Sequence, residues 1–292
     1  MRRTLALNLP LLVKEDFLME PDAAKMVGQA TQQIITRGSY LTESGTEHEI
    51  SADLAFARAQ TITYAPDLPI PPGKAKYTQA MTYVHKQTAL MVAQARQRRG
   101  YRVAILNFTN PRDLGGGWLH GVPSQEASLA RSSGLIHCLI DHPWYRNRSH
   151  RINPFYDDTV IVTPNVPIFR GHEGDLLETP IRHTMISAAA VHASNVRLYM
   201  PPREAEIPLR MARRATRVIE AAATINANVL VLGAWGTGEF GHSPELIATA
   251  FQVALESPAI RAFAIIDFAI PDITPQTPVY AVFRNRFHEQ SV

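Results

Sequence analysis

Short runs of apolar, β-branched residues alternate with longer helical patterns through the last two-thirds of this chain. The runs with strand character are 102–108, 159–163, 229–232 and 263–268. The segments with helical periodicity are 77–98, 125–140, 204–225 and 244–256. Because apolar strands of this kind are buried on both faces, the alternation predicts an α/β fold, with a central sheet between two layers of helices.

The first part of the chain follows a different pattern. A helical segment at 23–37 is followed by Gly38-Ser39-Tyr40, polar turns and two short strand-like pieces, up to the proline-rich stretch 66–72. We therefore expect residues 1–75 to form an N-terminal extension packed on a main domain of residues 76–292. Residues 141–158 are rich in Arg, His, Asn and Pro, which predicts a long surface loop.

Composition excludes several classes of protein. The chain has 292 residues, 46% of them hydrophobic, and one cysteine, Cys138, so neither an intrachain disulfide nor a cysteine-based zinc site can form. A net charge of +3 is small and favours a solvated surface over a nucleic-acid partner. Met1-Arg2-Arg3 resembles a signal-peptide start but no cleavage site follows, and no apolar run approaches the ~18 residues of a membrane span. We expect a cytoplasmic monomer without a membrane partner.

The first of two glycine-rich loops lies between a predicted strand and a predicted helix. The strand ends at Phe108, the loop carries Asn110 and three successive glycines, and the helix begins near Gln125; the glycines are Gly115, Gly116 and Gly117. Glycines permit backbone conformations closed to other residues and let a ligand approach the main chain closely. The N-terminus of the following helix offers N–H groups to an anion.

The second loop follows the run 229–232. Its residues are Gly236, Thr237, Gly238, Glu239, Phe240 and Gly241, a G-x-G-x-x-G motif before a helix that Ser243 can cap. A Rossmann-type NAD-dependent oxidoreductase is the rival that this motif suggests. However, the motif lies near the C-terminus, a single predicted strand follows it, and Glu256 and Asp267 are poorly placed to hold a ribose. Two such loops at one sheet suit a diphosphate held from both sides.

Several motifs, in order along most of the chain, resemble the bacterial-type poly(ADP-ribose) glycohydrolases of the macrodomain superfamily. The hallmark of that family is Gly-Gly-Gly, a short spacer and Gln-Glu-Glu, and here Trp118 to Ser124 separate the glycines from Gln125-Glu126-Ala127. The likeness continues through Ser128-Leu129 and Arg131-Ser132-Ser133, Pro164-Asn165-Val166-Pro167, Ser187-Ala188-Ala189-Ala190 and the second glycine loop. The resemblance implies a macrodomain-like three-layer α/β/α fold with a mixed central sheet.

The resemblance also implies a ligand and a role for each loop. ADP-ribose, alone or within polymers or modified macromolecules, would place its distal ribose at the triple-glycine loop, with Asn110 and Glu126 contacting ribose hydroxyls. Gln125 would also be a ligand-binding residue. The loop from Gly236 to Gly241 would hold the diphosphate through its N–H groups, with Phe240 against the distal ribose. We expect Glu239 to point outward, because a carboxylate would repel the diphosphate. No cofactor or metal is implied, and His137, His142 and His150 lack the spacing of a metal site.

One residue departs from the family pattern. The reaction, hydrolysis of a ribose–ribose O-glycosidic bond, needs a general acid, and the resemblance places that acid at the position of Ala127. Glu126 cannot occupy the same space, since neighbouring helical side chains point about 100° apart. We therefore expect binding with weak or no hydrolysis. Two explanations stay open. Either a glutamate has been changed to alanine by engineering, or the natural protein lacks it and is a non-catalytic ADP-ribose reader or uses another acid.

Overall fold

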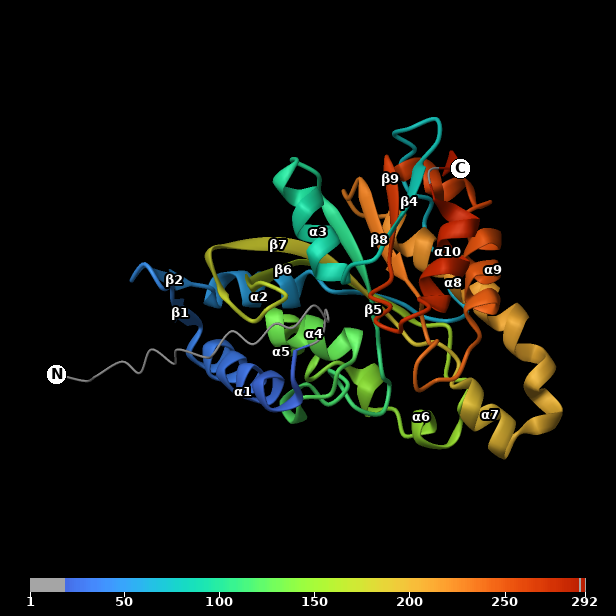
Figure 1. Cartoon of the computed structure of the whole chain (residues 1–292), viewed down its shortest axis with the longest axis horizontal. Coiled ribbons are helices and arrows are strands. Elements are labelled where there is room, and N and C mark those ends of the chain that lie inside the picture. Colours follow the sequence, from blue (N-terminus) through green and yellow to red (C-terminus); the bar gives the residue numbers. More distant parts are fainter. Residues whose placement is uncertain (1–18, 289, 292) are drawn as a thin grey trace.

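The computed structural model describes residues 19–288, 290 and 291 of the chain. Its main feature is an eight-stranded sheet (Figure 1) whose strands, in spatial order, are β10 (Gln290–Ser291), β4 (Met81–His85), β9 (Ile265–Ala269), β8 (Val229–Gly233), β5 (Val103–Phe108), β7 (Leu176–Ala188), β6 (Val160–Arg170) and β3 (Ile62–Tyr64). Neighbours from β4 to β7 are parallel, whereas the pairs β10–β4, β7–β6 and β6–β3 are antiparallel. The predicted mixed sheet is confirmed.

Helices cover both faces of this sheet. One layer contains α7 (Ala193–Tyr199), α8 (Ile207–Ala223), α9 (Pro244–Ala254) and α10 (Pro278–Phe287), and the other contains α2 (Ser51–Ala59), α3 (Ala89–Arg98), α4 (Gln125–Ser132) and α5 (Leu135–Leu139). Because side chains alternate along a strand, Leu106 of β5 packs in the first core and Ile105 in the second. The three-layer architecture is therefore built from strands that are apolar on both faces.

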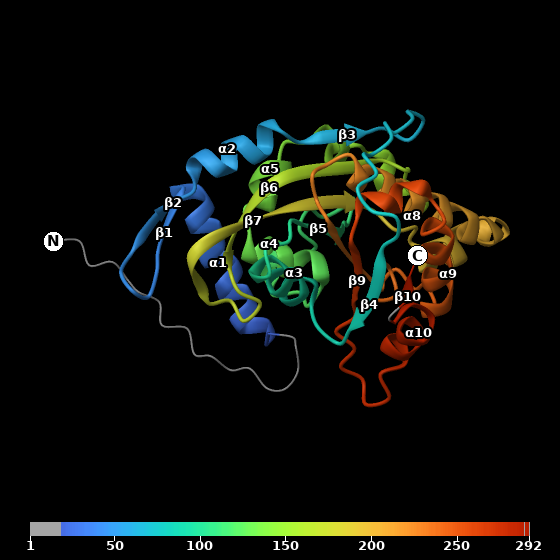
Figure 2. The ribbon, with the colours of Figure 1, turned by 90° about the horizontal axis from the view of Figure 1, so that it is seen from above.

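The N-terminal part of the chain lies against this domain (Figure 2). It consists of α1 (Pro21–Arg37), β1 (Ser39–Leu41), β2 (Glu47–Glu49), α2 and β3. Helix α1 packs on α4 and on the short 3-10 helix Trp118–His120, so closely that a Cβ at Gly28 would lie 2.5 Å from the Trp118 carbonyl oxygen. Since β3 is itself an edge strand of the main sheet, the division at residue 75 stays a prediction.

The signal-peptide-like start, Met1-Arg2-Arg3, lies outside the described residues. Within the part of the chain that the structure describes, none of the helices has the length and apolar character needed to cross a membrane.

The single helix predicted over 77–98 is wrong. The structure has strand β4, a short connection, and then α3, which Thr88 caps by accepting a hydrogen bond from Met91 N at 3.3 Å. In β4 the side chains of Thr82 and Val84 are buried while their neighbours are partly exposed. This alternation with a period of two is typical of a strand. The prediction missed it because the apolar residues of α3 follow closely, and the two segments together resemble one longer helix.

Further elements differ from the prediction, and helices α2, α7 and α10 were not predicted at all. The helix predicted over 125–140 is divided into α4 and α5, because Ser133 is extended and Gly134 N donates to Pro167 O at 2.9 Å. The loop predicted over 141–158 contains the 3-10 helix Pro143–Arg146 and α6 (Ser149–Ile152). Strand β7 was not predicted, because its first half is at most partly buried and mixes apolar with polar residues without a regular alternation. The predicted cap of α9 is confirmed: Ser243 Oγ accepts from Leu246 N at 3.3 Å.

Candidate functional site

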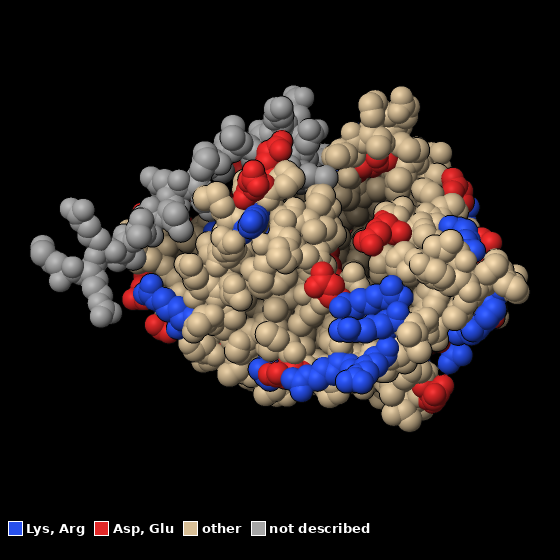
Figure 3. Space-filling view, turned by 90° about the horizontal axis from the view of Figure 1, so that it is seen from below, with Lys and Arg blue, Asp and Glu red and all other residues tan. Residues whose placement is uncertain are grey.

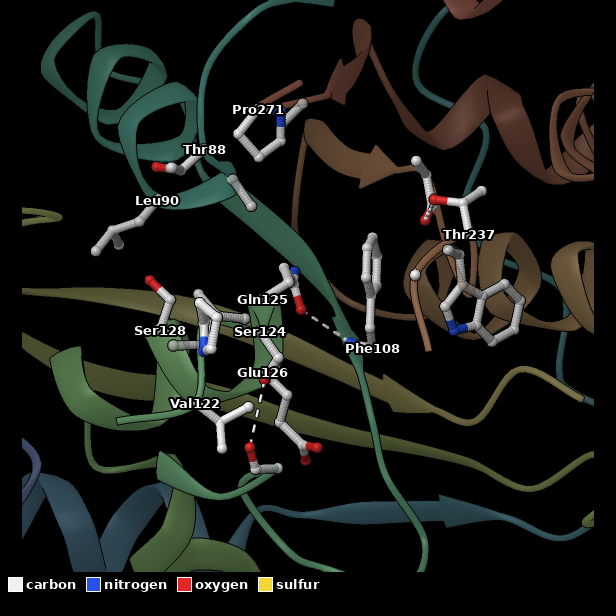
Figure 4. Close-up of a pocket in the computed structure, with 18 of the residues that line it drawn as sticks. Thr88, Leu90, Phe108, Val122, Ser124, Gln125, Glu126, Ser128, Thr237 and Pro271 are labelled. Carbon is white, nitrogen blue, oxygen red and sulfur yellow. Dashed lines mark hydrogen bonds between the residues drawn. The ribbon is translucent and has the colours of Figure 1, made fainter. Parts of the chain in front are cut away.

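A cavity of about 580 Å³ opens where the parallel strands β5, β8 and β9 end. Its walls come from the segments that follow these strands, from the start of α4 and from the start of α3 (Figure 4). In open α/β sheets ligands bind at the carboxyl ends of the strands. The structure thus brings both predicted glycine loops to the edge of one cavity.

The triple-glycine loop covers the start of α4. Gly115, Gly116 and Gly117 have φ values of 84°, 54° and 75°, all in the left-handed region that favours glycine. A Cβ at Gly115 would lie 2.6 Å from Trp118 Cδ1, and one at Gly116 would lie 3.1 Å from Ser124 Oγ. The backbone path of the loop therefore depends on glycine at these positions.

Gln125 joins α4 to the end of β5. Its Nε2 donates to Leu106 O at 2.7 Å and its Oε1 accepts from Phe108 N at 3.0 Å, the latter drawn in Figure 4. The helix begins here because Ser124 caps it, with Oγ accepting from Ala127 N at 3.1 Å. Gln125 lines the cavity, but its amide is used to fix the helix to the sheet.

Glu126 is a buried carboxyl group on the cavity wall. It is 2% exposed, and its Oε2 accepts from Asn110 N at 2.8 Å. Asn107 Nδ2 and Thr109 Oγ1 each lie 3.5 Å from Oε1. Burial raises the pKa of Glu126 to about 8, although the N–H groups of Asn110 and Gly115 favour the charged form. At neutral pH the protonated carboxyl can both donate to and accept from a hydroxyl.

Ala127 lies on another side of α4. Its side chain is fully buried and packs with Trp118, Ala130 and Ile136, and it is not part of the cavity wall. The predicted divergence of neighbouring helical side chains is therefore seen here, with Glu126 on the cavity and its neighbour in an apolar cluster. At the triple-glycine end of the cavity, helix α4 therefore supplies one carboxyl group, that of Glu126, and Ala127 supplies none.

The second glycine loop forms the opposite wall. Gly236 and Gly241 have φ values of 83° and 74°, while a Cβ at Gly238 would meet no atom within 4 Å. The part of the loop that lines the cavity is Gly236, Thr237, Gly238, Glu239 and Phe240, and Gly241 lies behind it. Exposed backbone N–H groups before the N-terminus of α9 suit an anionic ligand.

Phe240 is held by two aromatic side chains that the sequence did not single out. Its ring stacks on His192 with centroids 4.5 Å apart, and it lies 6.1 Å from the ring of Tyr156. Glu239 beside it is exposed. Phe240 is therefore fixed from behind and presents its other side to the cavity, whose wall it helps to form.

The far end of the cavity was missed from the sequence altogether. It is lined by residues from the start of α3, the end of β9 and the start of α10, namely Thr88, Ala89, Leu90, Ala269, Ile270, Pro271, Asp272, Ile273 and Val279. These residues are mostly apolar and lack a motif, so they could be recognised only after the chain had folded.

The candidate histidines do not form a cluster. His142 Nε2 lies 2.8 Å from Thr63 Oγ1 and His150 Nε2 lies 3.3 Å from Asp157 Oδ2. Within residues 19–288, 290 and 291, the structure brings together no three His, Cys, Asp or Glu side chains that could hold a metal ion. Trp118 and Trp235, which lie beside the two glycine loops, are core residues with 6% and 1% of their surface exposed.

The raised pKa of Glu126 predicts a pH dependence of stability. The folded chain holds this proton more tightly than the unfolded chain, where the pKa is about 4.3, so the free energy of unfolding should fall from about pH 4.5 to 8. In Glu126→Gln, the contribution of Glu126 to this decrease in the free energy of unfolding should disappear. Urea unfolding measured across the same pH range tests this. The lowered pKa values of His183 and His242, both about 4, affect both proteins alike. Parallel stability curves for the two proteins would show that Glu126 is not a protonated buried acid.

Comparison with known proteins identifies the family of this site. The family model for the microbial-type PARG catalytic domain matches residues 28–171. The solved structure of poly(ADP-ribose) glycohydrolase from Thermomonospora curvata is 33% identical with a TM-score of 0.83, and the match covers 91% of this chain and 100% of that one. No curated protein sequence matched the chain.

Two other solved structures contain ligands. The Thermomonospora curvata enzyme bound to the inhibitor ADP-HPD is 32% identical over 91% of this chain and 100% of that one, with a TM-score of 0.80. The Deinococcus radiodurans poly(ADP-ribose) glycohydrolase in complex with ADP-ribose is 32% identical over 80% of this chain and 96% of that one, with a TM-score of 0.73. With its macrodomain-like sheet, its two glycine loops and this extent of similarity, the chain belongs to the bacterial-type poly(ADP-ribose) glycohydrolases.

Proposed function

We propose that the cavity binds ADP-ribose, with the distal ribose at Glu126 and the diphosphate at the loop from Gly236 to Gly238. The observation that carries this proposal is that two glycine loops face one cavity, with a single buried carboxyl at one end. The similar enzymes in complex with ADP-ribose and with ADP-HPD support the same class of ligand. The polymer and ADP-ribosylated macromolecules would be the larger ligands, bound by a cytoplasmic monomer.

Each end of the cavity suits one part of this ligand. Glu126 and the polar groups near Asn110 can hydrogen-bond ribose hydroxyls, and the ring of Phe240 can pack against the sugar. The backbone N–H groups around Gly238 can hold phosphate oxygens, since Gly238 lines the cavity and has open space where a side chain would be. The apolar far end, with Leu90 and Ile273, leaves room for the adenine ring.

The reaction of this family is hydrolysis of the ribose–ribose O-glycosidic bond, and we infer that this chain performs it slowly. The departing oxygen needs a proton, and loss of a positioned general acid costs roughly 10²–10⁴ in rate. Ala127 supplies no acid, and Glu126 has its Oε2 engaged by Asn110 N. Glu126 is nevertheless protonated at neutral pH by its raised pKa and is the group that can support residual hydrolysis.

A non-catalytic reader of ADP-ribose is the second candidate, because Ala127 packs well in its apolar cluster. An NAD-dependent oxidoreductase has no such support. Its sheet would be mainly parallel with the G-x-G-x-x-G loop after the first strand, whereas here that loop follows β8 in a sheet with three antiparallel pairs.

Ligand-dependent melting tests the proposed binding. At a hundredfold excess over Kd, ADP-ribose should stabilise the folded chain by about 2.7 kcal/mol and raise its melting temperature by roughly 5 °C or more. NADH at the same concentration, the ligand of the rival hypothesis, should raise it much less. A melting temperature that stays unchanged in millimolar ADP-ribose would refute the proposal.

A further inference from the structure

Three arginines lie on α6 or against it, outside the cavity wall. Arg112 Nε donates to the carbonyl oxygen of His150 at 2.9 Å, which holds its side chain against the backbone of α6 one residue before Arg151. Arg148 is one turn earlier, since Arg151 N donates to its carbonyl oxygen at 3.0 Å. Figure 3 shows Lys and Arg side chains gathered beside a hollow on the face seen from below, where α6 lies.

A series of aromatic contacts connects Arg112 to the end of the cavity where the ribose is proposed to bind. The Arg112 guanidinium lies 5.7 Å from the centre of the Tyr156 ring, which in turn lies 6.1 Å from Phe240 on the cavity wall. The backbone N of Arg112 also donates to Asn110 Oδ1 at 3.0 Å. The arginine group is therefore joined to the part of the site where Glu126 lies, at the opposite end from Thr88 and Ile273.

The charges of this group are not balanced within the folded chain. Arg148 and Arg151 are exposed and form no ion pair or side-chain hydrogen bond with any residue that the structure describes, whereas Arg146 pairs with Asp141 at 2.6 Å. Of the acids on the neighbouring segments, Asp157 is engaged by Trp144 and His150, and Asp141 by Arg58 and Arg146. Asp113 and Glu239 belong to the glycine loops. The surface beyond Tyr156 is therefore positive.

We propose that Arg112, Arg148 and Arg151 form a second anion subsite, which takes the diphosphate of the next ADP-ribose unit in a polymer. The proposal rests on the proposed function, because it requires the terminal ribose to lie at Glu126. A polymer chain joined to that ribose leaves the cavity past Tyr156 and brings its next diphosphate to the arginines. Planar guanidinium groups bind phosphate oxygens through paired N–H groups. The diphosphate of the terminal unit is held elsewhere, at Gly236 to Gly238.

Affinities for two probes test this subsite. Calorimetry with the full chain would compare monomeric ADP-ribose with a short ADP-ribose oligomer of defined length. The Arg148→Gln/Arg151→Gln protein should lose affinity for the oligomer by about three- to tenfold, as expected for two exposed charge contacts, and keep its affinity for the monomer. The matched control is Arg98→Gln/Arg99→Gln at the exposed end of α3, which should change neither affinity.

Other outcomes would overturn the subsite in distinguishable ways. Equal oligomer affinity in the wild-type chain and the α6 double variant would refute it while leaving the proposed function intact. An equal loss of monomer affinity would assign the arginines to the terminal unit. Equal binding of a single-stranded DNA oligomer of matched charge, with the same loss in the double variant, would make nucleic acid the occupant. A wild-type chain that binds neither ADP-ribose probe would refute the proposed function, and the subsite with it.

Discussion

Ala127→Glu is expected to raise the hydrolysis of poly(ADP-ribose) by this chain at least ~100-fold, the lower edge for a positioned general acid. Side chains of a helix tilt towards its N-terminus, so a glutamate here would extend towards Ser124 and Gly116, which line the cavity. ADP-ribose affinity should change little, because the acid acts on a bond that the product no longer has. The measurement is release of ADP-ribose from polymer under single-turnover conditions.

The matched control is Ala127→Gln, which adds a side chain of the same shape without an acidic proton. Both variants place a polar group beside Trp118 and Ile136, so both should lose about 1–3 kcal/mol of stability, and only the glutamate should gain rate. If the folded glutamate variant binds ADP-ribose and stays inactive, the site has changed elsewhere and the chain is a reader. If the wild-type chain already hydrolyses polymer at an ordinary enzymatic rate, Glu126 or another group is the acid.

Gly238→Val is expected to weaken ADP-ribose binding by roughly 100-fold or more, because two or more hydrogen bonds to a charged diphosphate would be lost. The fold should survive, since a Cβ at Gly238 meets no atom within 4 Å and φ there is not in the left-handed region. Calorimetry gives the affinity and thermal unfolding gives the stability. Gly238→Ala is the graded control and should lose less affinity.

Gly116→Val should also abolish binding, but with a loss of stability. Its φ of 54° strains any other residue, and the new side chain would press on Ser124 and Glu126. Gly238→Val therefore tests ligand binding alone, whereas Gly116→Val tests both ligand binding and the backbone conformation of its loop. Undiminished affinity in a well-folded Gly238→Val protein would show that this loop does not hold the diphosphate.

The sequence predicted the layers of the fold because burial on both faces leaves a local pattern in β5, β8 and β9. It did not predict β7, whose register depends on pairing with β5 and β6, far away in the sequence. The division between α4 and α5 also has a distant cause, since Gly134 N donates to Pro167 O, and the close approach of Leu54 leaves no room for a Cβ at Gly134. Such tertiary contacts override a local helical pattern.

For the site, the two glycine loops and Glu126 could be picked out from the sequence because each lies in a short local motif between a predicted strand and a predicted helix. The roles of Gln125, Glu126 and the two loops remain proposals that the geometry supports. His192 and Tyr156 could not be found, because an aromatic side chain behind Phe240 has the same appearance in a sequence as any core residue. The apolar wall at Leu90 and Ile273 likewise arises only when α3 and the end of β9 come together.

A crystal structure of the chain with ADP-ribose would show where the ligand binds. We expect one ligand in the cavity, with a distal-ribose hydroxyl within hydrogen-bonding distance of Glu126 and phosphate oxygens at the N–H groups around Gly238. The adenine should lie towards Leu90 and Ile273. A ligand bound in the reverse direction, with its diphosphate away from Gly238, or bound outside the cavity, would refute the proposed binding mode.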